Sequence, residues 1–329
     1  MQVKEKIGVN DFMISIAMAT YNGEKYLREQ LDSILAQTIT DWELIICDDC
    51  SKDSTVELLT RYQRKDDRIK IFVNEKNLGF KKNFEKAIGL CSGDYIALAD
   101  QDDIWHENHL EVLQELIGDA SLSCGNASLM TADSVVTEKK LNVIDHLLFI
   151  PTKNEKLLYR ILFISDPFQG ASMLIKKQFL SKILPIPEGV LYHDAWIAAC
   201  ACFEKGIAYT FEQITDYRQH ENNVTVAAQR LSVKKKSFIH KCKQGFKVLF
   251  SKKILYTDRF FYLAALSERY GDTNEDLCKI RDAYKNRHTN KLKVILFLWK
   301  NWFYISTTKS YKGFFPFVFT FFNLRPYNE

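Results

Sequence analysis

The chain has 329 residues and a formal net charge of +4, from 45 Lys and Arg against 41 Asp and Glu. Hydrophobic residues make up 47% and charged residues 26%, a composition that indicates a folded protein and excludes an intrinsically disordered one. The N-terminal residues contain no secretory signal, and no run approaches the roughly 18 apolar residues of a membrane-spanning helix. We therefore expect one large or two smaller domains in the cytoplasm.

The small net charge hides an uneven distribution along the chain. Residues 230–329 hold 21 basic and 7 acidic side chains, a net charge of +14, whereas residues 1–229 hold 24 basic and 34 acidic ones, a net charge of −10. The most basic segment is 230–254, with nine Lys or Arg and no acid. An acidic body is thus followed by a basic tail, for which we expect a partner surface.

The first 115 residues alternate between predicted strands and predicted helices. Short apolar runs predict buried strands at 13–18, 43–47, 69–73 and 95–99, and apolar residues at helical spacing follow the first three of them. Residues 54–57 (STVE) match a capping box at the start of the second helix. This alternation predicts an α/β fold with a parallel sheet.

The pattern weakens after residue 115. Strands are predicted at 129–132, 171–175 and 207–211 and a buried helix at 195–203, whereas 134–165 allow no assignment. After residue 229 the strand signal fades, and helical segments rich in Lys, Phe and Leu follow. We expect a domain over 1–228, with halves at 1–115 and 116–228, and a mainly helical region over 229–329.

Polar side chains follow three of the predicted strands. Residues 20–22 (TYN) follow the first strand, Asp48 and Asp49 the second, and residues 100–103 (DQDD) the fourth. In parallel α/β sheets, ligands bind outside the carboxyl ends of the strands. The three clusters are therefore expected on one rim and together favour a binding site there, although Asp48 and Asp49 alone are equally compatible with turn formation.

The acidic cluster of Asp100, Asp102 and Asp103 allows two interpretations. Packed carboxylates repel one another, so a cation is a natural neutraliser, and Mg²⁺ is typically held by one or two carboxylates plus substrate phosphates. The first interpretation is therefore a Mg²⁺ or Mn²⁺ site that binds a diphosphate. The second is a solvated acidic loop in which Asp103 caps the next helix. The sequence contains no P-loop and no GxGxxG motif.

Taken in order, several segments resemble the family 2 glycosyltransferases, the inverting enzymes with a GT-A fold. The matching segments are ISIAMATYNGEKYLREQLDSILAQT, WELIICDDCSKDST, NLGFKKNFEKAIGLCSGDYIALADQDDIW, FQGASMLI, HDAW and YRQHENN. They cover about residues 13–225, and a minor departure is His106-Glu107, where the family usually has a proline. The resemblance implies a Rossmann-like, mostly parallel central sheet with flanking helices, in which 1–115 bind the nucleotide sugar and 116–228 the acceptor.

The resemblance also implies roles for single residues, carried over position by position. The residues expected to bind the nucleotide sugar are Thr20, Tyr21, Asp49, Asn77, Gly79, Asn83, Asp100 and Arg218. The residues expected to bind Mg²⁺ or Mn²⁺ are Asp102 and His220, and those expected on the acceptor side are Gln169, Gly170 and Trp196.

Asp194, in the segment HDAW, matches the general base of the family. An acceptor hydroxyl is a poor nucleophile at neutral pH, and a carboxylate within hydrogen-bond reach can take its proton as it attacks the anomeric carbon. The metal on the diphosphate would stabilise the leaving group. From the residues alone, Asp194 is instead read as the N-cap of the helix that follows.

The tail segment 230–254 interleaves its Lys with Phe, Ile, Val and Leu. Such a segment suits an anionic membrane surface, and a lipid-linked acceptor would place the enzyme, as a peripheral protein, at the inner face of the cell membrane. The alternative is a helical subdomain packed on the body with its Lys solvated. Nucleic-acid binding is not expected, because no recognisable module accompanies the charge.

The expected function is inverting transfer of a sugar from a nucleotide-diphospho-sugar donor to a glycan or lipid-linked saccharide acceptor. The resemblance favours bacterial surface polysaccharide synthesis, such as O-antigen or capsule, and ADQDDIW with YRQHENN resembles rhamnosyltransferases. Two alternatives stay open: a nucleotidyltransferase acting on sugar phosphates, and a non-catalytic membrane-binding protein with a degenerate site. The intact set of Asp49, Asp102 and Asp194 argues against degeneracy.

Overall fold

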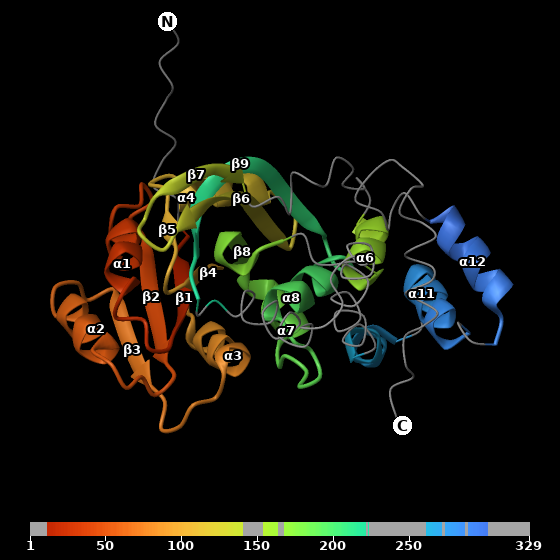
Figure 1. Ribbon diagram of the computed structural model, residues 1–329, viewed down its shortest axis with the longest axis horizontal. Coiled ribbons are helices and arrows are strands. Elements are labelled where there is room, and N and C mark those ends of the chain that lie inside the picture. The colour runs from red at the N-terminus through yellow and green to blue at the C-terminus, as the bar shows by residue number, and fades with distance from the viewer. Residues whose placement is uncertain are drawn as a thin grey trace, which may run out of the picture.

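A computed structural model describes most of the chain up to residue 221 and part of the C-terminal region (Figure 1). The described residues are 12–140, 154–163, 168–221, 223, 261–271, 274–286 and 289–301. The basic segment 230–254, for which a membrane contact is expected, lies outside them.

One sheet organises the described residues, with the strand order β3-β2-β1-β4-β8-β6-β9-β5 and β7 paired to β6. Its first four strands are parallel and are β1 (Ile14–Thr20), β2 (Trp42–Asp48), β3 (Ile69–Val73) and β4 (Tyr95–Asp100). In this register Thr20 pairs with Asp48 and Ala19 pairs with Asp100, so the carboxyl ends of the three central strands form one rim.

The second half of the sheet mixes strand directions. It contains β5 (Ile104–Trp105), β6 (Leu122–Thr131), β7 (Val136–Lys140), β8 (Met173–Lys176) and β9 (Ile207–Gln219). Strand β8 is antiparallel to both of its neighbours, β4 and β6, whereas β9 is parallel to β6. The mostly parallel sheet expected from the resemblance is confirmed, and the strictly parallel part ends at β4.

Helices cover both faces of the sheet. Helices α1 (Leu27–Leu35), α2 (Thr55–Gln63) and α4 (His109–Ile117) pack their apolar faces into one core layer. Helices α3 (Phe80–Leu90) and α8 (His193–Ala201) pack into the other. Shorter helical turns are η1 (Gly170–Ser172), η2 (Lys177–Phe179) and α7 (Leu180–Ile183).

The described C-terminal helices continue the core of the α/β body. They are the helix formed by residues 261–270, α11 (Glu275–Lys285) and α12 (Lys291–Lys300), and α6 (Asn154–Phe163), which lies earlier in the chain, packs with them. Their buried side chains, such as Leu162, Leu266 and Tyr284, belong to the same apolar cluster as those of α8. The helical character expected after residue 229 is confirmed for these residues, and none of the described helices is long and apolar enough to span a bilayer.

Several local predictions differ from the structure. Residues 129–132 are only the end of the ten-residue strand β6, and 171–172 form a 3-10 turn before β8. Helix α2 does begin at Thr55, but Ser54 makes no side-chain capping bond, and the Thr55 N–H donates to the Asp53 carboxylate. The unassigned stretch 134–165 contains β7 and α6, whose pairing and packing are long-range.

Candidate active site

The rim at the carboxyl ends of β1, β2 and β4 brings the expected polar clusters together. Thr20 Oγ1 donates to Asp48 Oδ2 over 2.8 Å, and Asp48 also accepts from the Ser51 hydroxyl over 2.6 Å. Thr20 and Asp48 are buried, whereas Tyr21 is 47% exposed. Of this group, Tyr21 is therefore the side chain that offers a free face to a ligand.

Asp49 holds the loop that precedes α3. Its carboxylate accepts from the main-chain N–H groups of Leu78 (2.7 Å) and Gly79 (2.8 Å) and from Asn74 Nδ2 (2.9 Å). Gly79 has φ +80° and ψ 153°, a conformation that glycine adopts at no steric cost. Asp49 thus fixes the path of the loop in which the nucleotide contacts are expected.

The two expected asparagines of this region have different surroundings. Asn83, on α3, is 1% exposed, donates to the Cys47 carbonyl over 2.7 Å and accepts from Asn74 over 2.8 Å. Asn77 lies in the exposed part of the loop, and its Nδ2 donates to the Asp49 carbonyl over 3.2 Å. Asn83 therefore connects α3 to β2, whereas Asn77 lies at the exposed edge of the rim.

The acid cluster after β4 contains carboxylates in different environments. Burial, followed by the charges of Asp102 and Asp194, raises the pKa of Asp100 to about 8. Asp103 is fully buried, and its Oδ1 accepts the main-chain N–H of Arg218 over 3.0 Å. Asp103 is therefore a structural residue, and it does not cap the next helix, whose N-cap is Asn108.

His220 completes this cluster. The residue follows β9 directly, and its Nε2 lies 2.6 Å from Asp102 Oδ2. No group of three His, Cys, Asp or Glu side chains among the described residues is arranged to hold a metal ion. The Asp102 carboxylate nevertheless suits Mg²⁺ or Mn²⁺ when substrate phosphate oxygens supply further ligands.

Arg218 occupies a different place from the one expected. Its side chain is fully buried, and the Nε group donates to the Asp102 carbonyl over 2.7 Å. The terminal nitrogens donate to the Ser134 hydroxyl (2.7 Å) and to Glu29 Oε2 (3.0 Å). In place of the expected contact with the nucleotide sugar, Arg218 contacts protein groups and fixes the turn that carries Asp102.

Tyr26 also lies at this site, although the sequence did not indicate it. Its ring centroid lies 4.7 Å from that of His220, and the Arg218 guanidinium lies over the same ring at 4.6 Å. Tyr26 precedes α1, and its position in the segment TYNGEKYL gave no signal beyond helical spacing. Only the tertiary fold brings it to the end of β9.

Asp194 faces the acid cluster from α8. An added Cβ at Gly170 would lie 3.6 Å from the Asp194 Cβ, and the turn that contains Gly170 lies at the carboxyl end of β4, because the following strand β8 is antiparallel to β4. Asp194 is half-buried, and one carboxylate oxygen accepts the N–H of Ala195 over 2.7 Å. The N-cap of α8 is Tyr192, which corrects the reading of Asp194 as the cap.

The expected acceptor-side residues divide into two groups. Gln169 is half-buried, its side-chain amide has no hydrogen-bond partner within the described residues, and an added Cβ at the neighbouring Gly170 would lie 3.2 Å from His193 Nε2. Trp196, in contrast, is fully buried, and its indole N–H donates to the Ile183 carbonyl over 2.8 Å. Trp196 therefore belongs to the core beneath the site, contrary to the expectation.

His193, the residue before Asp194, stacks on Phe84 with ring centroids 4.3 Å apart. Neither ring nitrogen has a hydrogen-bond partner within the described residues. Burial lowers its pKa, which favours the neutral imidazole, although the nearby Asp194 opposes this shift. His193 and Gln169 thus provide polar groups beside Asp194 that a sugar hydroxyl could satisfy.

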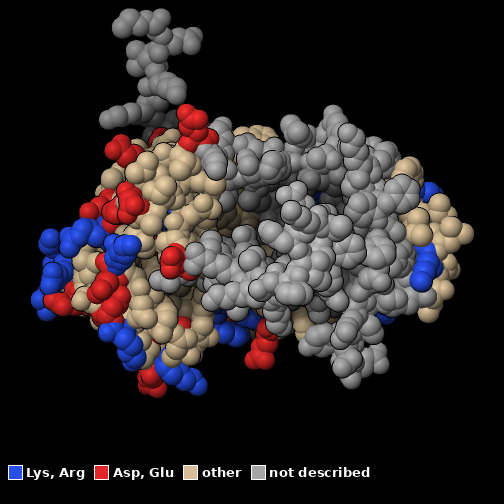
Figure 2. Space-filling model, viewed as in Figure 1, with Lys and Arg blue, Asp and Glu red and all other residues tan. Residues whose placement is uncertain are grey.

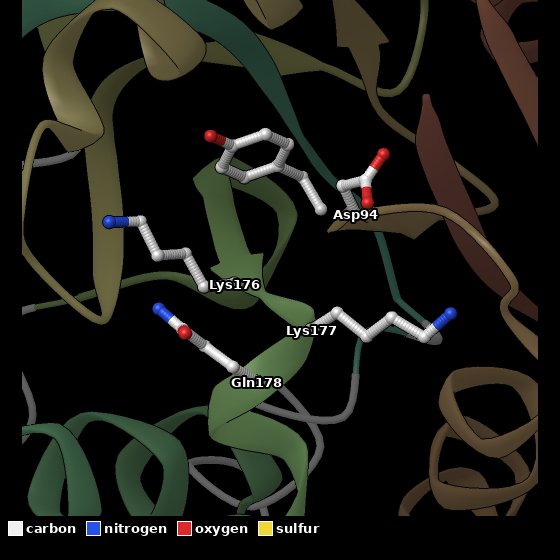
Figure 3. Close-up of a pocket in the computed structure, with 5 residues that line it drawn as sticks. Asp94, Lys176, Lys177 and Gln178 are labelled. Atoms are coloured by element: carbon white, nitrogen blue, oxygen red, sulfur yellow. The ribbon is translucent and has the colours of Figure 1, made fainter. Parts of the chain in front are cut away.

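A pocket of about 500 Å³ lies elsewhere, at the amino end of β4 (Figure 3). It is lined by Asp94, Tyr95, Lys176, Lys177 and Gln178. Figure 3 shows the two lysine side chains pointing away from each other, and their ammonium groups donate to the carbonyls of Gly118 and Ser92. This pocket has no part in the rim site.

The mixed, mostly parallel sheet with helices on both faces agrees with the GT-A fold that the sequence resemblance implies. The family model described as "Glycosyl transferase family 2" matches residues 15–184, just over half of the chain, so the chain belongs to this family.

Two relatives illustrate the match. The chain is 35% identical over 130 residues to a protein of Escherichia coli named UDP-Glc:alpha-D-GlcNAc-diphosphoundecaprenol beta-1,3-glucosyltransferase WfgD, covering 39% of this chain and 51% of the relative. It is 32% identical over 139 residues to TuaG of Bacillus subtilis, named for teichuronic acid biosynthesis, covering 42% and 55%. The chain thus spans about half the length of these curated relatives.

Solved structures share the fold. S. aureus TarS 1-349 in complex with UDP-GlcNAc matches with a TM-score of 0.50 and 16% identity, covering 89% of this chain and 82% of that one. The mannosyltransferase PcManGT from Pyrobaculum calidifontis, in complex with GDP-Man and Mn²⁺, matches with a TM-score of 0.52 and 13% identity, covering 90% and 86%. At these identities the likeness establishes the GT-A fold.

Proposed function

We propose that this protein transfers a sugar, with inversion, from a nucleotide-diphospho-sugar donor to a glycan acceptor. The observation that carries the proposal is that Asp194, on α8, packs against Gly170, whose turn precedes the antiparallel strand β8 and so lies at the carboxyl end of β4, where Asp100 is found. A base and a diphosphate-binding turn in one site are what a single displacement at an anomeric carbon requires.

In the proposed reaction, Asp194 accepts the proton of the acceptor hydroxyl as its oxygen attacks the anomeric carbon. The bond between that carbon and the diphosphate oxygen breaks on the opposite side, which inverts the configuration and releases a nucleoside diphosphate. Asp102 and His220 would hold Mg²⁺ or Mn²⁺, which supplies positive charge to the leaving diphosphate. Tyr21, Asn77 and the backbone at Gly79 would line the nucleotide.

The test is a panel of nucleotide sugars incubated with the protein and Mn²⁺ and analysed for products. Release of a nucleoside diphosphate supports glycosyl transfer, whereas pyrophosphate would indicate the nucleotidyltransferase alternative. Asp194→Asn is expected to lower transfer by at least about 100-fold, while Asp119→Asn, at an exposed acid after α4, serves as the control. Near-normal turnover in Asp194→Asn would overturn the assignment of the base.

The biological setting that we propose is bacterial surface polysaccharide synthesis, with a lipid-linked acceptor. Support comes from the names of the relatives, one of which includes a diphosphoundecaprenol-linked sugar. Rhamnose is the first donor sugar to test, because the segments ADQDDIW and YRQHENN resemble rhamnosyltransferases. Glucose, galactose and N-acetylated sugars follow in the same panel.

We further propose that the protein binds the inner face of the membrane through its basic C-terminal region. Helix α12 supports this proposal because Leu292, Leu296 and Trp299 are 70%, 53% and 41% exposed on one face. Lys residues occupy both ends of this helix, and it contains no acid. Figure 2 shows this end of the molecule as a mainly uncharged surface edged by basic side chains, the combination that suits anionic headgroups.

Co-sedimentation with phosphatidylglycerol-containing vesicles tests this surface. The double variant Leu292→Glu, Leu296→Glu and, separately, neutralisation of Lys234, Lys235 and Lys236 should each reduce binding. Val135→Glu, at an apolar residue that is 60% exposed between β6 and β7, is the control. Membrane docking would be contradicted if all variants sedimented with the vesicles to the same extent, or if the parent protein did not sediment with them at all.

A further inference from the structure

The helix formed by residues 261–270 contacts the backbone beside Asp194. Tyr262 on this helix is 1% exposed, and its hydroxyl makes two hydrogen bonds to the main chain of Tyr192. The hydroxyl donates to the carbonyl of Tyr192 over 3.0 Å and accepts the main-chain N–H of Tyr192 over 3.1 Å. Tyr192 is the N-cap of α8, two positions before Asp194.

These hydrogen bonds are made at the N-terminus of α8, where a helix has the fewest hydrogen bonds of its own. The first N–H groups of a helix lack intrahelical partners, and Tyr192 provides no side-chain capping bond. The Tyr192 carbonyl accepts the first helical N–H, from Trp196, over 3.3 Å and also accepts the Tyr262 hydroxyl. Tyr262 therefore fixes the start of α8 from outside the helix.

The loop that leads into α8 is held from two sides. Lys81, on α3, donates to the carbonyls of Pro187 (3.1 Å), Glu188 (2.6 Å) and Val190 (2.7 Å). From the C-terminal helix, Phe261 packs so closely that an added Cβ at Gly189 would lie 2.4 Å from its ring. The loop is thus clamped between the nucleotide half and the C-terminal region.

We infer that Tyr262 is a positioning residue for Asp194, which sets the angle at which the carboxylate meets the acceptor hydroxyl. This inference rests on the proposed role of Asp194 as the base. The Tyr262 hydroxyl contacts main-chain atoms only two residues away from that base. Its loss should therefore impair the chemical step and leave donor binding intact.

The variant Tyr262→Phe removes the hydroxyl and keeps the buried ring. We expect kcat to fall about tenfold, because a small misplacement of a reacting group is costly, and KM for the nucleotide sugar to change less than about twofold. The matched control is Tyr284→Phe on α11, since Tyr284 is also 1% exposed and its hydroxyl donates to the Leu162 carbonyl over 2.9 Å. Both variants should lower the melting temperature similarly.

Hydrogen–deuterium exchange gives a second readout that does not need activity. Tyr262→Phe should speed exchange in residues 190–196 more than Tyr284→Phe does. Equal exchange in the two variants, or a kcat loss shared by both, would overturn the inference. If the parent protein transfers no sugar, the proposed function fails, whereas the exchange measurement still decides whether Tyr262 fixes this turn.

Discussion

The imidazole of His220 lies 2.6 Å from the carboxylate of Asp102, so the residue after β9 meets the turn after β4. Neither partner is held by this contact alone. Arg218 binds the Asp102 carbonyl, and Tyr26 lies against both the Arg218 guanidinium and the His220 ring. The positions of the proposed metal ligands Asp102 and His220 therefore depend on Arg218 and Tyr26, which contact other protein groups and are not proposed as metal ligands.

The first prediction concerns His220. His220→Ala should weaken Mn²⁺ binding in the presence of the nucleoside diphosphate that the substrate panel identifies, by about tenfold or more, because one of two proposed protein ligands is lost. Isothermal titration with Mn²⁺ measures this change. His106→Ala is the control, since His106 is bonded to Asp216 on β9 and lies outside the acid cluster. Equal Mn²⁺ affinity in the two variants would contradict the ligand assignment.

The second prediction concerns Arg218. Arg218→Lys keeps the charge but cannot bind Asp102, Ser134 and Glu29 at once, so Mn²⁺ affinity should fall about 10-fold to 100-fold, as for other residues that orient metal ligands. Arg269→Lys is a matched control, because Arg269 donates to the carbonyls of Lys182 and Pro185, away from this turn. Unchanged affinity in Arg218→Lys would show that Asp102 is positioned without the guanidinium.

The third prediction concerns Gly79. At φ +80° an alanine is strained, so Gly79→Ala should lower the free energy of unfolding by about 1–3 kcal/mol. It should also weaken nucleotide binding, because the Gly79 N–H binds Asp49. Gly89→Ala, where an added Cβ meets open space on α3, should be neutral or stabilising by up to about 1 kcal/mol. Chemical denaturation of the two variants compares their free energies of unfolding, and titration with the nucleotide compares their binding.

The fourth prediction concerns Glu43 and pH. Burial alone would raise its pKa, but hydrogen bonds from Lys70, Ser92 and Ser15 outweigh this effect and lower the pKa to about 2. Because the folded-state pKa is depressed, the stabilisation is present above the unfolded value of 4.5 and is lost as the pH falls towards about 2.

Glu43→Gln should therefore cost about 2 kcal/mol at pH 7 once solvent screening of Lys70 is allowed for, and its stability should depend less on pH between about 5 and 2. Glu57→Gln is the control, because Glu57 pairs with Arg61 at the surface and is 65% exposed. Thermal unfolding across this pH range tests the difference. A parallel pH dependence in the parent and Glu43→Gln would refute it.

Short-range patterns were sufficient to predict the first half of the fold. The four parallel strands occur within one or two residues of the expected positions, because each is a short apolar run bounded by turn residues. The rim position of Thr20, Asp49 and Asp100 followed from strand direction alone. The roles proposed for Asp194 and His220 depended on the family resemblance, since a single acid and a single histidine carry no intrinsic signal.

The features that the sequence did not reveal depend on distant contacts. The resemblance predicts that Arg218 binds the nucleotide sugar, yet Glu29 and Ser134, from α1 and the β6–β7 turn, bind its guanidinium. Tyr26 acquires its role only where α1 meets the end of β9. Trp196 follows Asp194 closely in sequence, but the helical rotation between them turns the indole into the core.

Helix α8 is apolar on nearly every side, since all its residues except Asp194 are buried. On one side, Arg269 lies over Trp196 at 5.0 Å and Tyr270 donates to the Cys200 carbonyl, so the C-terminal helix shields α8 from water. A chain truncated near residue 228 would expose this surface and aggregate through it. Residues 1–228 are therefore not expected to fold stably by themselves. Exchanging residues 116–228 between relatives would require the C-terminal helices to be transferred with them.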